Sequence, residues 1–214
     1  MIALEGVEKS YGENRILKDL NLFVPTGKFL SIMGRSGSGK STLLNLVGGM
    51  DRPDQGRIII GNEEISGYSE ERLTLYRRKR VGYVFQFFNL LPNLTAQENI
   101  EMPLLLNGVY GYGGKIIDLM DSLGLGGKEG SYPHQLSGGE QQRVAICRAI
   151  IHDPDIILAD EPTGNLDSKA GHAIMALLRE MCEKRGKTLL LVTHDLAVAQ
   201  YGEEILKLRD GKLG

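Results

Sequence analysis

Eight residues at positions 34–41, with the sequence Gly-Arg-Ser-Gly-Ser-Gly-Lys-Ser, are the part of this chain best suited to hold phosphate. They fit the pattern G-x-x-x-x-G-K-[S/T], with an apolar run before them and a helix-like segment after them. Glycines let the backbone curl so that N–H groups point at phosphate oxygens, and the following helix adds partial positive charge. We expect Lys40 to reach the β- and γ-phosphates of a nucleotide, and the Ser41 hydroxyl to bind Mg²⁺.

Two adjacent carboxylates, Asp160 and Glu161, follow an apolar run at 156–159. We expect Asp160 to meet Mg²⁺, mostly through water, and Glu161 to polarise a water molecule for in-line attack on the γ-phosphate. Pro162 disfavours helical geometry in the residue before it, so Glu161 is predicted to be extended at the strand tip. An Asp-Glu pair alone is usually a solvated strand end. The phosphate loop upstream favours the catalytic interpretation.

The run Leu-Ser-Gly-Gly-Glu-Gln-Gln-Arg at 136–143 opens a predicted helix over 140–151. Ser137, Gly138 and Gly139 therefore lie at a helix amino terminus, which attracts anions. Such a site without its own phosphate loop nearby would be half a site. The alternative is an ordinary helix cap with glycines, which explains the tripeptide but not all eight residues. Together with the phosphate loop, the run predicts an ATP site shared between two chains.

Strand and helix patterns alternate along the chain in an order that would position these residues. Strands are predicted at 2–7, 20–24, 29–33, 57–60, 81–85 and 205–208, and fully buried parallel strands at 156–159 and 188–192. Helices are predicted at 41–47, from a capping box at 95–98, at 115–123 and at 140–151. Another lies along a face that includes Ile174 and Met181 and ends at Gly186.

This order predicts an α/β fold, with a P-loop NTPase core built on a mainly parallel sheet, an antiparallel β subdomain and an inserted helical subdomain. We expect one domain over residues 1–214. Its core and β subdomain would take approximately 1–86 and 151–214, and the helical subdomain 87–150.

Composition excludes several classes of protein. The chain has 214 residues, 42% of them hydrophobic, and a net charge of −2, which suits a compact unit and does not favour a nucleic-acid partner. No apolar run approaches the roughly eighteen residues of a membrane span, and the amino terminus lacks a secretory pattern. Cys147 and Cys182 are expected to be buried apolar side chains, and the scattered histidines predict no zinc site. We therefore expect a cytoplasmic protein.

The phosphate loop, the LSGGEQQR run, the Asp160–Glu161 pair and a histidine after a buried strand occur in the order typical of the nucleotide-binding subunits of ABC transporters. This resemblance covers essentially the whole chain. It implies that each subunit binds ATP with Mg²⁺ and that two copies close on it as a homodimer. The serine and second glycine of LSGG would contact the γ-phosphate held by the opposite subunit. ATP-binding residues would be Tyr11, Gly34, Arg35, Ser36, Gly37, Ser38, Gly39, Lys40, Ser41 and Thr42, and in trans Ser137, Gly138, Gly139 and Gln141.

Other residues match the family one by one. Tyr11 is similar to the aromatic that stacks on adenine, although such a tyrosine is more often plain packing. Gln86 resembles the glutamine that touches Mg²⁺ and the attacking water. Asp167 matches a loop that crosses the dimer interface, and could equally be a helix N-cap. His194 resembles the histidine that contacts the γ-phosphate. The expected catalytic residues are thus Glu161, His194 and Gln86, and the metal ligands Ser41, Gln86 and Asp160.

Two further segments, residues 159–167 (ADEPTGNLD) and 85–92 (FQFFNLLP), resemble the branch that contains macrolide-efflux, lipoprotein-release and cell-division ATPases. Arg35 stands where many members have proline, at a variable position. Residues 108–114 are glycine- and tyrosine-rich where relatives tend to be charged and helical, which weakens the inference about partner contacts there.

The resemblance implies an ATP-driven clamp, peripheral on the cytoplasmic face of the membrane, that powers a separate integral membrane permease of the macrolide or lipoprotein type. An apolar patch would help to receive that partner, or form the core of the helical subdomain: Phe87, Phe88, Leu90, Leu91 and Leu94. One alternative is a mechanical regulator that moves no substrate, like the cell-division relative. Another is a soluble ABC-type ATPase, although the long coiled coils or tandem cassettes of that class are missing. A simple P-loop kinase leaves LSGGEQQR unexplained.

Overall fold

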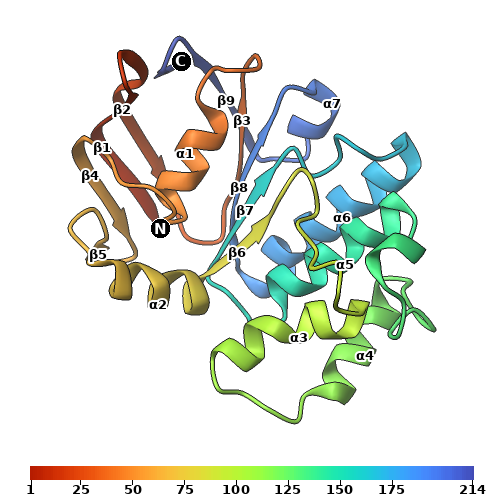
Figure 1. The fold of residues 1–214 in the computed structure, drawn as a ribbon. Coiled ribbons are helices and arrows are strands. Elements are labelled where there is room, and N and C mark those ends of the chain that lie inside the picture. Colours follow the sequence, from red (N-terminus) through yellow and green to blue (C-terminus); the bar gives the residue numbers. More distant parts are fainter.

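A computed structural model describes residues 1–214, and the larger of its two sheets has the strand order β10-β9-β3-β8-β7-β6 (Figure 1). All neighbouring strands in it are parallel except β10 and β9. The carboxyl ends of the parallel strands therefore meet at one edge, where the candidate site lies. The strands are β3 (Phe29–Met33), β6 (Val81–Val84), β7 (Ile156–Asp160), β8 (Thr188–Thr193), β9 (Glu204–Arg209) and β10 (Lys212–Leu213).

The smaller sheet is antiparallel throughout, with the order β2-β1-β4-β5. It consists of β1 (Ile2–Tyr11), β2 (Asn14–Val24), β4 (Gln55–Ile60) and β5 (Glu63–Glu64). Helix α1 (Lys40–Val47) lies between the two sheets (Figure 1). Its Leu43 and Leu44 share one buried cluster with Ile2 of β1 and Leu158 of β7. Packing against both sheets therefore fixes the position of α1, and with it the position of Lys40.

Successive residues of a strand point to opposite faces, and β7 shows this directly. Ile156 and Leu158 belong to the cluster around α1, whereas Ile157 and Ala159 pack with helices on the opposite face of the sheet. Those helices are α5 (Gly138–Ile150) and α6 (Ser168–Arg185). All six residues of β8 are buried, which confirms the predicted fully buried strand. The predicted end of α6 is also confirmed, with Gly186 at a φ of 62°.

A third cluster lies among α3 (Ala96–Leu106), α4 (Gly113–Ser122) and α5, below the large sheet in Figure 1. The capping box predicted at 95–98 is present, because the Thr95 hydroxyl accepts a bond from Glu98 N–H and the Glu98 carboxylate accepts one from Thr95 N–H. Cys147 of α5 and Cys182 of α6 are both buried. None of the helices combines the length and the apolar character that a membrane crossing requires.

Helix α2 (Glu70–Arg80) was not predicted from the sequence. Seven of its eleven residues are charged, and only Leu73 and Tyr76 are buried. An apolar stripe of two residues is too narrow to be recognised as helical periodicity. Four shorter elements were also missed: η1 (Pro133–Gln135), α7 (Leu196–Ala199), β5 and β10.

Candidate functional site

The loop between β3 and α1 has the backbone shape that a phosphate site needs. Gly37 and Gly39 have φ values of 77° and 102°, in the left-handed region that favours glycine. Gly39 is the N-cap of α1, and no side chain accepts a hydrogen bond from the first turn. The free N–H groups at this helix amino terminus therefore face the inside of the loop, where an anion is stabilised.

Lys40 is held inside this loop. Its side chain is 8% exposed, and Nζ donates to the carbonyl oxygens of Gly34 at 2.9 Å and Arg35 at 3.1 Å. Nζ also lies 3.8 Å from Oε1 of Glu161. The ammonium group thus stands between the phosphate loop and the end of β7, which is where a γ-phosphate would need it.

Glu161 is buried beneath the end of β8. Its Oε2 accepts a hydrogen bond from the Thr193 hydroxyl at 2.9 Å, and its Oε1 lies 2.8 Å from Nδ1 of His194. The extended backbone predicted for Glu161 is wrong, because its φ is 45°. Glu161 N–H still donates to Val192 O at 3.0 Å, so β7 pairing reaches this residue and the chain then turns sharply. The sharp turn overrides the extended preference that Pro162 imposes.

Asp160 ends β7 and lies close to α1. Burial raises the pKa of its carboxyl group, and a hydrogen bond from the Ser41 hydroxyl only partly offsets this effect. Gln86 lines the same cavity as Ser41 and Asp160. Hydroxyl, carboxylate and amide oxygens are hard ligands, which suit Mg²⁺. A buried carboxylate disfavoured by desolvation also suits a bound cation, so the residues present fit the predicted metal.

These side chains line one cavity of about 620 Å³ at the carboxyl edge of the large sheet. Tyr11 stands at its rim, with its side chain half exposed. The cavity gathers most of the predicted cis site together with one unpredicted residue, Ile16. Its lining is Tyr11, Ile16, Arg35, Ser36, Gly37, Gly39, Lys40, Ser41, Thr42, Gln86, Asp160, Glu161 and His194.

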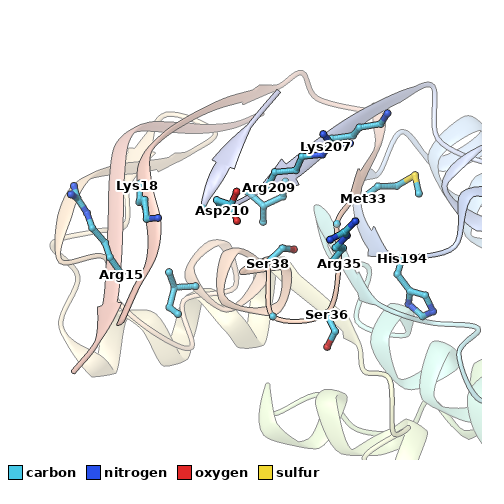
Figure 2. Close-up of a pocket in the computed structure, with 15 residues that line it drawn as sticks. Arg15, Lys18, Met33, Arg35, Ser36, Ser38, His194, Lys207, Arg209 and Asp210 are labelled. Atoms are coloured by element: carbon cyan, nitrogen blue, oxygen red, sulfur yellow. The ribbon is translucent and has the colours of Figure 1, made fainter. Parts of the chain in front are cut away.

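Figure 2 shows a second cavity, of about 750 Å³, on the other side of the phosphate loop. Arg35, Ser36 and His194 line both cavities. The second cavity also holds the predicted Gly34 and Ser38, beside basic side chains such as Arg209 of β9. Because Lys40, Asp160 and Glu161 do not line it, we place the chemistry in the smaller cavity.

The predicted in-trans residues are not part of either cavity. Ser137 is the N-cap of α5 and forms a capping box with Glu140, and Gly138 and Gly139 lie between them in the first turn. Backbone and hydroxyl hydrogen bonds from Ser137 lower the pKa of Glu140 to about 2. Gln141 donates to Leu136 O at 3.1 Å. Within one chain, the structure therefore leaves the LSGG run apart from the phosphate loop.

Asp167 is the N-cap of α6, since its Oδ1 accepts a hydrogen bond from Ala170 N–H at 2.9 Å. The N-cap alternative is therefore confirmed for this residue. The neighbouring Asn165 donates from its side chain to Gln86 O at 2.8 Å, which ties the loop after β7 to the loop after β6.

Two groups of site residues were missed from the sequence. Thr193 meets Glu161, and its position directly before the predicted His194 was the available signal. Lys9 and Asp51 both contact Tyr11, and the available signal was a lysine two positions before the tyrosine, the spacing of neighbours on one face of a strand.

The model of the ABC transporter family matches residues 17–164 of this chain. The chain is 47% identical to the uncharacterized ABC transporter ATP-binding protein MJ0796 of Methanocaldococcus jannaschii, over 100% of this chain and 95% of that protein. It therefore belongs to the ABC transporter family, as an ATP-binding cassette and an ATPase of the ABC type.

Among solved structures, the dimeric structure of MJ0796, described as a bacterial ABC transporter cassette, has a TM-score of 0.94 at 46% identity, covering 100% of this chain and 96% of that chain. A structure of the same cassette in a post-hydrolysis state, bound to ADP and Pi, has a TM-score of 0.93. The predicted α/β fold is confirmed. Another relative is the pyoverdine export ATP-binding/permease protein PvdT of Pseudomonas syringae pv. syringae, 42% identical over 99% of this chain and 33% of that protein.

Proposed function

We propose that this chain is the motor subunit of an ABC exporter, which works as an ATP-dependent homodimer against an integral membrane permease. The observation that carries the proposal is the division of the site residues. Lys40, Asp160 and Glu161 share one cavity, whereas Ser137 and Gly139 lie outside it. Two copies arranged head to tail would complete two sites, since each would supply the LSGG run to the other. The dimeric MJ0796 cassette supports this arrangement.

Hydrolysis would use the side chains that meet at the end of β7. Lys40 would exchange the carbonyl oxygens of its own loop for β- and γ-phosphate oxygens. Glu161 would take a proton from the attacking water, while His194 holds its carboxylate and approaches the γ-phosphate. Ser41, Asp160 and Gln86 would hold Mg²⁺, which offsets phosphate charge when bound. Tyr11 would stack on adenine at the rim, and Asp167 would face the partner across the interface.

The loop after β6 is the proposed contact with the permease. Phe87 is 70% exposed and Leu91 is 46% exposed, so two members of the predicted apolar patch are open to a partner. Leu90 instead packs against the cluster of α3, α4 and α5, which supports the core interpretation for that residue. That separate cluster also supports the division into a core and a helical subdomain over 87–150. A permease partner would place the cassette on the cytoplasmic face of the membrane.

Sequence similarity to an export protein favours export over import. PvdT is named as an export ATP-binding/permease protein, and 33% of its length aligns with 99% of this chain. We therefore infer the macrolide and lipoprotein type of exporter, with a permease of four spans and a large extracytoplasmic domain. Co-purification from solubilised membranes tests this inference, and a soluble partner would argue against it.

Glu161→Gln tests the shared site and its chemistry together. The variant removes the proton acceptor but keeps the shape, so ATP hydrolysis should fall by at least about 100-fold. ATP binding should persist, and size-exclusion chromatography with ATP should show a trapped dimer. Glu64→Gln, on exposed strand β5, is the matched control. Wild-type turnover by Glu161→Gln would refute the base assignment, and a monomer with bound ATP would refute the shared site.

A further inference from the structure

The ring of Tyr11 is held in place by two charged residues that do not line the cavity. Its hydroxyl donates to Oδ2 of Asp51 at 2.6 Å. The other oxygen of Asp51 accepts a hydrogen bond from Lys9 Nζ at 2.7 Å. Asp51 lies in the loop that follows α1, so this network connects β1 to the helix that carries the phosphate loop.

Lys9 is buried in a way that is unusual for its residue type. Its side chain is 10% exposed, and Nζ also donates to Arg52 O at 2.7 Å and lies 3.7 Å from Asp54 Oδ1. Long charged side chains are rarely buried unless they are paired. Burial lowers the pKa of Lys9, but the hydrogen bond to Asp51 and the nearby carboxylates outweigh it and leave the pKa raised. The ammonium group therefore stays charged.

The same ammonium group lies 5.2 Å from the centroid of the Tyr11 ring. A cation at this distance is attracted to the face of an aromatic ring. Tyr11 lines the cavity with Lys40 and Thr42, whereas Lys9 does not. The ring thus has support on the protein side and an open side toward the cavity.

We propose that Asp51 and Lys9 are positioning residues that hold Tyr11 in the orientation on which adenine stacks. Asp51 anchors the hydroxyl end of the ring, and Lys9 fixes both Asp51 and the ring from behind. Selectivity for a nucleotide base over a bare triphosphate then depends on two residues that never touch the base. The inference rests on the proposed function, because it requires Tyr11 to be the base contact.

The test compares the dissociation constants of ATP and inorganic tripolyphosphate, which engages the phosphate loop but has no base. Tyr11→Phe removes only the hydroxyl anchor at a half-exposed position, so folding should be intact. We expect it and Asp51→Ala to weaken ATP by about threefold to tenfold and to leave tripolyphosphate unchanged. Glu64→Ala is the control, since Glu64 is an exposed carboxylate on β5, outside the network of Lys9, Asp51 and Tyr11. It should leave the ratio of the two constants unchanged.

Tyr11→Ala separates this inference from the proposed function. If it weakens ATP by about tenfold or more and spares tripolyphosphate, Tyr11 is the base contact. A wild-type ratio for Tyr11→Phe would then overturn the positioning role while the base contact stands. If Tyr11→Ala also keeps the wild-type ratio, the base contact itself is wrong and the inference falls with it. Equal weakening of both ligands by Tyr11→Phe would likewise overturn it, because it would indicate damage to the phosphate loop.

Discussion

Glu161 has a backbone conformation that is uncommon for any residue other than glycine. Both oxygens of its carboxylate also have polar partners. Its φ of 45° lies in the left-handed region, which costs a non-glycine residue about 1–3 kcal/mol. Its carboxylate meets Thr193 and His194, at the end of β8, and Lys40, at the end of the phosphate loop. Such strain persists where surrounding contacts determine it, and it occurs often at functional sites. The geometry therefore supports the proposed role of Glu161.

Glu140 gives a prediction with a defined pH window. Because its folded pKa is lowered from 4.5 to about 2, the carboxylate stabilises the folded state above about pH 4.5, and this stabilisation is lost as pH falls toward 2. Glu140→Gln should therefore lower the free energy of unfolding by about 1 kcal/mol at neutral pH. The difference between variant and wild type should shrink at about pH 4, measured by urea unfolding.

Asp118→Asn is the control for this measurement, because Asp118 is exposed on α4 and forms no ion pair. Its difference from wild type should stay small at both pH values. A Glu140→Gln difference that grows on acidification would contradict the assigned capping role.

At the scale of elements, Arg148 joins the loop after β6 to α5. Its guanidinium group donates to Asn89 O at 2.6 Å and to Phe88 O at 2.7 Å. Both loop residues have positive φ, and Arg148 has no carboxylate partner. Burial lowers the pKa of Arg148. The charged bonds thus hold a turn that would otherwise be unfavourable, at the base of the proposed permease contact.

Arg148→Met should release this loop while it keeps the apolar stem of the side chain. We expect the free energy of unfolding to fall by about 2 kcal/mol, because two carbonyl groups lose a charged donor. Backbone amides over 86–94 should exchange faster in hydrogen-exchange mass spectrometry. Arg78→Met is the control, since Arg78 is exposed on α2 and makes only a 3.4 Å bond to Leu106 O. Equal protection of 86–94 in both variants would show that Arg148 does not brace the loop.

At the scale of the whole molecule, the catalytic cavity and the LSGG run are two half-sites on one chain. This arrangement predicts complementation between two inactive variants. Lys40→Ala should lose ATP binding at its own loop, and Gly139→Asp should place a negative charge against the partner's phosphate. A mixed dimer contains one site in which both halves are intact. An equal mixture should therefore regain about a quarter of the wild-type sites, measured as ATP hydrolysis.

The control is Gly139→Ala, because a Cβ built at Gly139 would lie 3.6 Å from its nearest neighbours, an ordinary contact. This variant should fold and dimerise, so that the effect of Gly139→Asp can be assigned to charge. If the mixture stays as inactive as the separate variants, the two half-sites do not act in trans.

Much of the fold was predictable, because its strongest elements carry local signals. The apolar runs of β3, β7 and β8, the capping box of α3 and the glycine after α6 all depend on residues within a few positions of each other. Helix α2 shows the opposite case. This helix is stabilised by Leu73 and Tyr76, which pack into the cluster around α1. The other residues of α2 are mostly charged, so the sequence gives little indication of this packing.

The candidate site divides in the same way. The sequence by itself determined the phosphate loop, the Asp160–Glu161 pair and the helix start at Ser137, since each depends on residue types at short fixed spacings. Only the tertiary structure decided what surrounds them: Thr193 against Glu161 across 32 positions, and Asp51 against Tyr11 across 40. The tertiary structure also places Glu161 in the left-handed region and not in the extended conformation. Such contacts form between chain segments that folding brings together, so no local pattern encodes them.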